Sequence, residues 1–236
     1  MFLLFGFFRE ENQTVAERKD MAIKIMLDAG HFGKYNRSPV MDSYYESEAM
    51  WEFSVLLGEA LREYGFEVSF TRAKQANDLP LYRRGASAKG CDVFLSLHSN
   101  ACDVSDVDRI EVYRSVNAPH AERFAQTVAD AVASCMSVSR VEVKVREGST
   151  QGVDYYGVLR GASDVSVPYS LIVEHSFHTN PRAVAWLSEK CNLQTLAQAE
   201  ARAVADYFGI PLRGDYNRDG KVNAKDYMML KRDLLD

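Results

Sequence analysis

The stretch IKIMLDAGHFG, residues 23–33, joins an apolar run to a glycine-rich turn. Its isoleucine and leucine residues predict a buried strand that ends at Asp28. Gly30 and Gly33 allow the backbone to turn tightly on either side of His31. Because α/β proteins place their chemistry at the carboxyl ends of strands, this turn makes His31 a candidate functional residue. A single loop histidine also fits a structural role, so the interpretation depends on partners elsewhere in the chain.

The composition is that of a globular protein with one medium-sized α/β domain and a small appendage. The chain has 236 residues, of which 47% are hydrophobic and 26% are charged. A net charge of −5 argues against a nucleic-acid partner, which would require a basic face. No apolar run approaches the ~20 residues of a membrane span. Residues 1–20 are expected to form a loosely ordered arm, and the apolar residues 2–8 lack the basic start and cleavage site of a convincing signal peptide.

Strands and helices alternate along residues 21–210, which we expect to form the main domain. Apolar spacing predicts helices over 47–64, 81–89, 119–134, 181–187 and 193–208. Apolar and β-branched runs predict strands over 23–27, 66–71, 92–97, 109–113, 155–159 and 170–174. The charged, glycine-containing stretch 141–152 predicts a loop at the edge of the site. This alternation predicts an α/β fold with a twisted, mixed and mostly parallel sheet and helices on both faces.

A second histidine stands at the end of another predicted strand. His98 directly follows the apolar run 93–97, and the carboxyl ends of parallel strands can bring it to the same crevice as His31. Imidazole is a good zinc ligand, and catalytic zinc sites usually have three protein ligands, for which two histidines and a glutamate are one common set. The pattern therefore directs the search to a carboxylate near the same edge of the sheet.

Helical spacing separates the two glutamates that open the first helix. Glu46 falls on the apolar, inward-facing stripe, whereas Glu48 falls on a charged stripe that we expect to be solvated. An unpaired carboxylate would be costly in the inward position, and a metal ion would remove that cost. The alternative is that Glu46 only caps the helix.

Glu174 ends the last apolar strand, again at the carboxyl edge. A carboxylate there can take a proton from an attacking water and pass it to a leaving amine. The alternative is a salt bridge with Arg160 or Arg182. His175 points to the opposite face of the strand and is interpreted as a packing residue, whereas His178 is a candidate for the wall of the cleft.

Asp28, three residues before His31, has two interpretations. It accepts a hydrogen bond that orients a ligand imidazole, or it only forms the turn. The sequence leaves both interpretations open.

Four segments in a fixed order carry a resemblance to a known family. They are DAGHFG (28–33), Glu46 at a helix start, SLHSNA (96–101) and VEHSFHTNP (173–181). Over about residues 23–208 this pattern resembles the type 3 zinc-dependent N-acetylmuramoyl-L-alanine amidases, which cleave peptidoglycan. Ala29 and Phe32 replace the proline and glycine that are usual in the family's turn, which affects the stiffness of the turn and the cleft wall but not the ligand set.

The resemblance implies that His31, Glu46 and His98 bind zinc and that Glu174 is the catalytic carboxylate. The implied reaction is hydrolysis of the amide bond between N-acetylmuramic acid and L-alanine, in which Glu174 carries a proton from the attacking water to the amine. Arg160 is a candidate for holding the carboxylates of the stem peptide. The alternatives are a cell-wall-binding module without catalysis and a zinc peptidase of related fold that acts on other peptides. A peptidoglycan substrate implies an extracellular or cell-wall location.

The C-terminal segment 211–236 matches the spacing of an EF-hand calcium loop. The residues at its liganding positions are Asp215, Asn217, Asp219, Lys221 through its carbonyl, Asn223 and Asp226. Gly220 lies at position 6, where the sharp turn requires glycine. A helix is predicted over 226–235. The alternative is a charged turn with an amphipathic tail that binds no ion.

An aspartate at the last position of the loop makes this segment resemble one dockerin repeat. Dockerins have paired repeats, whereas this segment has one, which argues against a cohesin scaffold as its partner. We expect the repeat to fasten the tail to the domain or to be a truncated remnant.

Overall fold

The computed structural model describes residues 22–217 and 219–235, and the arm expected over residues 1–20 lies outside these ranges. A six-stranded sheet with the spatial order β2-β1-β3-β6-β4-β5 forms the centre. Its strands are β1 (Lys24–Ala29), β2 (Glu67–Phe70), β3 (Val93–Asn100), β4 (Ile110–Arg114), β5 (Val141–Lys144) and β6 (Tyr169–Phe177). Strands β2, β1, β3 and β6 are parallel, whereas β4 runs antiparallel to β6 and parallel to β5. The predicted mixed, mostly parallel sheet is confirmed.

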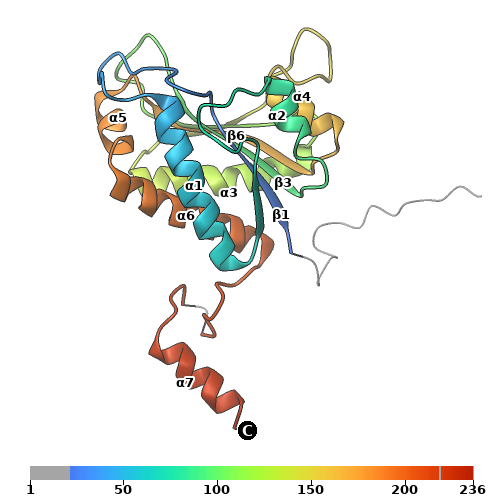
Figure 1. The fold of residues 1–236 in the computed structure, drawn as a ribbon, viewed down its shortest axis with the longest axis vertical. Coiled ribbons are helices and arrows are strands. Elements are labelled where there is room, and N and C mark those ends of the chain that lie inside the picture. The colour runs from blue at the N-terminus through green and yellow to red at the C-terminus, as the bar shows by residue number, and fades with distance from the viewer. Residues whose placement is uncertain (1–21, 218, 236) are drawn as a thin grey trace, which may run out of the picture.

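Helices cover both faces of the sheet (Figure 1). The helical segments are α1 (Glu46–Tyr64), α2 (Leu81–Ala86), η2 (Pro119–Ala121), α3 (Glu122–Met136), α4 (Gly157–Asp164), α5 (Pro181–Leu187), α6 (Lys190–Phe208) and α7 (Ala224–Asp233). Alternate strand residues face the two layers. Leu95 and Val173 lie in the large core with α1, α3 and α6, whereas Phe94 and Ile172 lie in the small core with α4.

Residues 141–144 form the edge strand β5, so the prediction of a loop there is wrong. Val141 and Val143 pack against the large core, and the pleat turns Glu142 and Lys144 to the other face. The period-two alternation of VEVK is the signal for this strand, and the charge of the stretch concealed it.

The predicted strand over 155–159 is also wrong, because helix α4 begins at Gly157. Glycine disfavours helices, but here it permits close contact between α2 and α4. A Cβ atom on Gly85 would lie 1.9 Å from the backbone oxygen of Val158, and one on Gly161 would lie 2.0 Å from that of Tyr82. A tertiary contact therefore decides this element against its local propensity.

The C-terminal segment leaves the two helical layers, and α7 lies beyond them (Figure 1). The loop before α7 contacts the domain at two glycines. A Cβ atom on Gly65, at the end of α1, would lie 2.8 Å from the Arg213 guanidinium, and one on Gly220 would lie 2.9 Å from that of Arg202 on α6. None of the helices within the described ranges has the length and hydrophobicity that crossing a membrane requires.

Candidate metal centre

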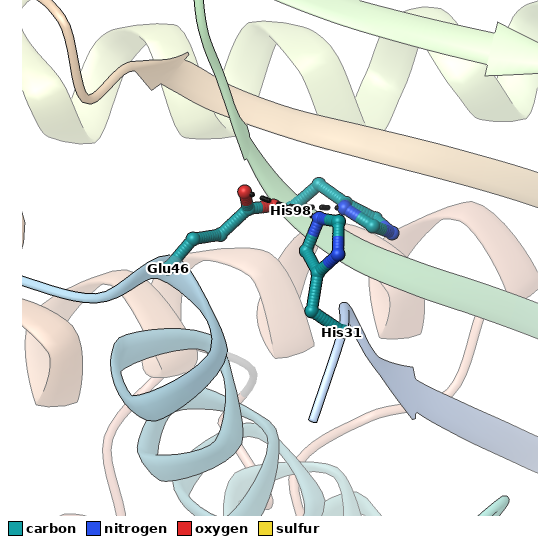
Figure 2. Close-up of side chains that lie close together, drawn as sticks. All are labelled: His31, Glu46 and His98. Atoms are coloured by element: carbon teal, nitrogen blue, oxygen red, sulfur yellow. Dashed lines mark hydrogen bonds and ion pairs between the residues drawn. The ribbon is translucent and has the colours of Figure 1, made fainter. Parts of the chain in front are cut away.

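Three side chains from separate elements meet at the carboxyl edge of the sheet (Figure 2). His31 follows β1, Glu46 opens α1 and His98 lies in β3. One ligand atom from each lies within 4.8 Å of the others. His98 Nδ1 is 2.8 Å from Glu46 Oε1, and His31 Nε2 is 3.3 Å from Glu46 Oε2. Across residues 22–217 and 219–235, no other three His, Cys, Asp or Glu side chains gather in this way.

Helix α1 aims Glu46 inward at the first helical position. The side chain of Glu46 is 1% exposed, whereas Glu48 is exposed to solvent, as the helical spacing predicts. The N-cap residue is Tyr45, so Glu46 lies inside the helix rather than capping it. Its carboxylate accepts hydrogen bonds from the Asn36 side chain at 2.7 Å and from the backbone N–H of Ser99 at 3.2 Å. These donors fix the carboxylate between the two histidines.

The charges of the cluster stabilise one another. Burial opposes the charged form of Glu46, but hydrogen bonds with His31 and His98 lower its pKa well below the usual range. Burial likewise opposes protonation of His98, yet its hydrogen bond to Glu46 and the nearby carboxylates raise the pKa of His98 to about 9. A zinc ion at the same place would compensate the buried carboxylate as the proton does, so these residues fit the donor set of zinc.

The turn that carries His31 is held by buried arginines. His31 has a φ of 56°, a left-handed conformation that costs free energy outside glycine. Arg84, which is 2% exposed, donates to the backbone oxygens of Ala29 at 3.0 Å and His31 at 3.1 Å. Arg72 donates to the same Ala29 oxygen. Hydrogen bonds from Arg84 of α2 and from Arg72, which follows β2, therefore hold the backbone of the turn in place.

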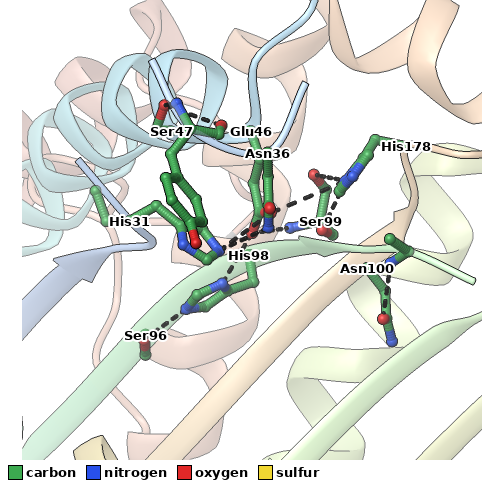
Figure 3. A network of polar contacts seen from close by, with 12 residues as sticks. His31, Asn36, Glu46, Ser47, Ser96, His98, Ser99, Asn100 and His178 are labelled. Carbon is green, nitrogen blue, oxygen red and sulfur yellow. Dashed lines mark hydrogen bonds and ion pairs between the residues drawn. The ribbon is translucent and has the colours of Figure 1, made fainter. Parts of the chain in front are cut away.

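Asp28 orients His98 indirectly, through Ser96. Figure 3 shows the contact between Ser96 and His98. The Ser96 hydroxyl donates to Asp28 Oδ2 at 2.8 Å, and Thr71 and Arg84 donate to Oδ1. Because the single hydroxyl hydrogen of Ser96 goes to the carboxylate, its oxygen accepts from His98 Nε2, 3.2 Å away. In the metal-free protein His98 Nδ1 donates its own proton to Glu46 Oε1, 2.8 Å away. Because Nε2 keeps its proton for Ser96, Nδ1 is the nitrogen that can release its proton and bind a metal.

Glu174 lies beside His98 in the next strand. The two residues are register partners in β3 and β6. Burial raises the pKa of Glu174 to about 8 against the opposing charge of His98, and the nearby carboxylates of Glu46 and Glu111 raise it further. Among the described residues, Glu174 Oε2 has no hydrogen-bond partner although it is buried. A free, buried carboxylate oxygen next to a histidine–glutamate–histidine cluster is suited to proton transfer.

The two arginines proposed as salt-bridge partners of Glu174 contact other groups. Arg182 pairs with Asp108, and Arg160 Nη1 donates to the backbone oxygens of Asp154 at 2.9 Å and Tyr155 at 2.6 Å. Within the described chain neither arginine forms that salt bridge. The substrate-binding role of Arg160 stays a prediction.

Sequence reasoning missed a polar row that continues from Glu174 to the edge of the sheet. Register pairing places His98, Glu174, Glu111 and Glu142 side by side on β3, β6, β4 and β5. Glu111 is 2% exposed and accepts hydrogen bonds from four side chains, those of Asn100, Arg109, Tyr113 and Lys144. The alternation of apolar and charged residues in VEVK could have predicted β5, and with it the position of Glu142 next to the other carboxylates of this row.

The two other histidines of the last motif contact different partners. His175 is fully buried, as its predicted direction away from Glu174 implies, and its imidazole contacts the carboxyl group of Glu200. His178 is buried, its Nδ1 lies 4.0 Å from Glu46 Oε2, and burial lowers its pKa. The hydroxyl of Ser99 lies between His178 and Tyr44, within 3.0 Å of each. His178 therefore supports the cluster from behind rather than lining an open cleft.

The predicted calcium loop is compact. Asp215 accepts from the backbone N–H groups of Asp219 and Gly220, and Asp226 accepts from those of Asn217 and Asn223. Asp215 and Asp226 are buried. The predicted helix begins at Ala224, two residues earlier than expected, with Asn223 as its cap. The loop therefore directs its first and last aspartates inward.

The fold and its histidine–glutamate–histidine cluster define an α/β protein with a candidate metal centre. The family model for N-acetylmuramoyl-L-alanine amidase matches residues 25–206, and the model for the dockerin type I domain matches residues 213–236. The chain belongs to the N-acetylmuramoyl-L-alanine amidase family and has a dockerin type I domain at its C-terminus. No curated protein gives a significant match to the sequence.

Solved amidase structures share this fold. An N-acetylmuramoyl-L-alanine amidase from Clostridium difficile 630 aligns with 80% of this chain and 97% of its own, at a TM-score of 0.68 and 22% identity. The second structure is the catalytic domain of CwlV, an N-acetylmuramoyl-L-alanine amidase from Bacillus (Paenibacillus) polymyxa var. colistinus. It aligns with 80% of this chain and 99% of its own, at a TM-score of 0.66 and 21% identity. Cwp6 from Clostridium difficile aligns with 79% of this chain at a TM-score of 0.65 and 22% identity. The aligned part is only 29% of the Cwp6 chain.

Proposed function

We propose that this protein hydrolyses the amide bond between N-acetylmuramic acid and L-alanine in peptidoglycan, with zinc held by His31, Glu46 and His98. The observation that carries the proposal is the carboxylate of Glu174, which is buried, lies in register with His98 and, among the described residues, leaves Oε2 unpartnered. Membership of the amidase family supports the substrate class.

The chain's own groups divide the work of amide hydrolysis. When bound, zinc supplies Lewis-acid activation of the scissile carbonyl and of water. Glu174 accepts a proton from the attacking water and delivers it to the amine nitrogen of L-alanine as the C–N bond breaks. Its raised pKa, about 8, supports both steps, because the carboxyl group can hold and release a proton near neutral pH. Glu46 stays ionised between the two histidines.

The test combines purified cell walls with a neutral replacement of the carboxylate. We expect the zinc-loaded protein to release new amino termini that carry L-alanine, identified by mass spectrometry of the muropeptides. Glu174→Gln should lower the rate about 10²- to 10⁴-fold, because proton transfer is lost, while metal analysis still finds one zinc per chain. Removal of zinc with a chelator should abolish the activity and re-addition should restore it.

A matched control separates this role from a general effect of lost charge. Glu48→Gln removes an exposed carboxylate of the same helix as Glu46, so it should leave both rate and zinc content unchanged. Activity that survives Glu174→Gln would refute the proposed mechanism. Binding to walls without release of amino termini would favour a cell-wall-binding module, and cleavage confined to other peptides would favour a zinc peptidase.

For the C-terminal segment we propose calcium binding by Asp215, Asn217, Asp219, Lys221, Asn223 and Asp226. The dockerin match and the inward aspartates support this assignment. A wall substrate and a dockerin segment together favour an extracellular or cell-wall location.

A further inference from the structure

A second histidine–carboxylate pair lies on the opposite face of the sheet from the candidate metal centre. His175 of β6 and Glu200 of α6 are both fully buried, with His175 Nε2 3.0 Å from Glu200 Oε2. The other ring nitrogen of His175, Nδ1, lies 2.9 Å from the backbone oxygen of His98. One imidazole therefore connects helix α6 to the backbone of a proposed zinc ligand.

The geometry fixes most of the hydrogen positions of this pair. A backbone carbonyl only accepts, so His175 Nδ1 donates to the oxygen of His98. His175 Nε2 and the Glu200 carboxyl group then share one proton. Oε1 of Glu200 is buried and, within the part of the chain that the structure describes, has no hydrogen-bond partner. Two apolar side chains would fill this space without that cost, so packing alone is a poor explanation of the pair.

The pair acts where the pairing of β3 and β6 changes register. Strand β6 places two residues between Glu174 and Phe177, where β3 places one between His98 and Asn100. Such a bulge interrupts the regular ladder and redirects the neighbouring side chains. At this point a side chain, that of His175, donates to the backbone oxygen of His98. The hydrogen bond therefore fastens the two strands next to the residues that carry the chemistry.

His175 also contacts the helix that carries Glu46. The ring of Phe53, on the buried face of α1, lies edge-on to the imidazole with 4.8 Å between centroids. The same imidazole thus touches α1, β3 and α6 and is part of β6. These elements include the sources of Glu46, His98 and Glu174.

We propose that His175 and Glu200 are positioning residues for the amidase reaction. The hydrogen bond from His175 Nδ1 to the His98 backbone holds His98 and Glu174 in the relative placement that zinc binding and proton transfer require. Glu200 holds the imidazole in the orientation that makes this bond. This inference rests on the proposed function, and it adds two residues from the far side of the sheet to the site.

The test uses two double variants that differ only in the donor. His175→Leu with Glu200→Leu removes the pair and leaves no buried charge. His175→Asn with Glu200→Leu also removes the carboxyl group but keeps a donor, because the amide nitrogen of asparagine lies as many bonds from the backbone as Nδ1 of histidine. Full-length protein is measured for kcat and KM on muropeptides, for thermal midpoint, and for the affinity of the metal-free protein for zinc by competition with a chelator.

We expect the leucine pair to lower kcat and zinc affinity roughly 10- to 100-fold, with KM within about twofold, because small displacements of reacting groups cost this much. The asparagine variant should recover most of both losses. Leu171→Ala, a buried change on the same strand and face, is the control for lost stability and should leave kcat and zinc affinity per folded molecule unchanged.

Two results would overturn the inference: wild-type kcat and zinc affinity in the leucine pair, or equal losses in both double variants. The zinc measurement does not depend on peptidoglycan chemistry. A wild-type protein without amidase activity would therefore reject the proposed function, whereas an unchanged zinc affinity in the leucine pair would reject the positioning role.

Discussion

At the scale of single residues, the hydroxyl of Ser96 decides which nitrogen of His98 faces the metal centre. Ser96→Ala leaves Asp28 and His98 Nε2 without their common partner. We expect zinc affinity to fall about 10- to 100-fold, because the tautomer of the ligand is no longer fixed. Chelator competition measures this loss. Ser170→Ala, which removes another buried hydroxyl of the same sheet, should not change zinc affinity. Equal losses in both variants would contradict the Ser96 relay, by which we mean the chain of hydrogen bonds from His98 through Ser96 to Asp28.

Glu111 gives the protein a specific response to acid. Burial would raise its pKa, but hydrogen bonds from Lys144, Arg109 and Tyr113 lower it. The stabilisation is therefore fully present above the unfolded pKa of about 4.3 and is lost as pH falls through the lower folded pKa. The charged or titratable groups that face it are Arg109, Tyr113, Glu142, Lys144 and Glu174.

Urea denaturation from pH 7 to pH 3 measures this response. Glu111→Gln should lower the free energy of unfolding at pH 7 and reduce its further decrease in acid. Glu48→Gln, on the exposed side of α1, should leave both unchanged. The same acid sensitivity in Glu111→Gln and wild type would show that other carboxylates dominate.

The sequence was informative for residues whose periodicity fixes a direction. Helical spacing was enough to turn Glu46 inward and Glu48 outward. The same reasoning did not find the Ser96 relay, because hydrogen bonds between strands depend on register, which no local pattern reports. It also left Asp28 with two interpretations, and only the neighbouring strands show that its carboxylate accepts from Ser96 and Thr71.

At the scale of elements, the contact of α2 with α4 depends on two glycines. Gly85→Ala and Gly161→Ala each place a methyl group about 2 Å from a backbone oxygen, which the helices can relieve only by separating. We expect each to lower stability by about 1–3 kcal/mol or more, and the thermal midpoint by roughly 2–4 °C per kcal/mol. Gly148→Ala, whose new atom would have 3.4 Å to its nearest neighbour, should change stability by less than about 0.5 kcal/mol. Calorimetry that finds all three alike would contradict the close crossing.

Element prediction succeeded where apolar spacing and chain breaks agree. The helix ending at Gly65 and the strands that carry Asp28 and His98 show this, although both strands continue past their predicted ends, to Ala29 and Asn100. It failed over 155–159, where glycine serves a helix contact, and over 141–144, where an edge strand carries partly buried charged side chains on one face. In both places packing partners distant in sequence decide the structure.

At the scale of the whole molecule, one face of the sheet forms most of the hydrophobic core and the other carries the candidate catalytic residues. The α1, α3 and α6 face buries most of the apolar side chains, and the face toward α2 and α4 ends in the polar row that includes His98 and Glu174. The tail attaches at the far ends of α1 and α6, next to Gly65 and Arg202. Calcium bound by the tail, as we propose, would therefore act on the helical layer rather than directly on the candidate metal centre.

Calcium should stabilise the protein through the tail. Asp215 and Asp226 are already buried and held by backbone N–H groups, so the ion would meet carboxylates that need little rearrangement. At a free calcium concentration 100 times Kd, binding adds about 2.7 kcal/mol to the free energy of unfolding of the part of the protein that the loop stabilises.

Scanning calorimetry with the zinc site saturated tests this expectation. The wild type should show a higher transition temperature in calcium, and Asp215→Ala should show none of this gain. Asp233→Ala, an acidic change in α7 outside the loop, should keep the gain, because net charge is altered equally but no ligand is lost. A calcium titration of the wild type without heat or shift would reject the loop as a calcium site, and an equal loss in both variants would assign the effect to general charge instead.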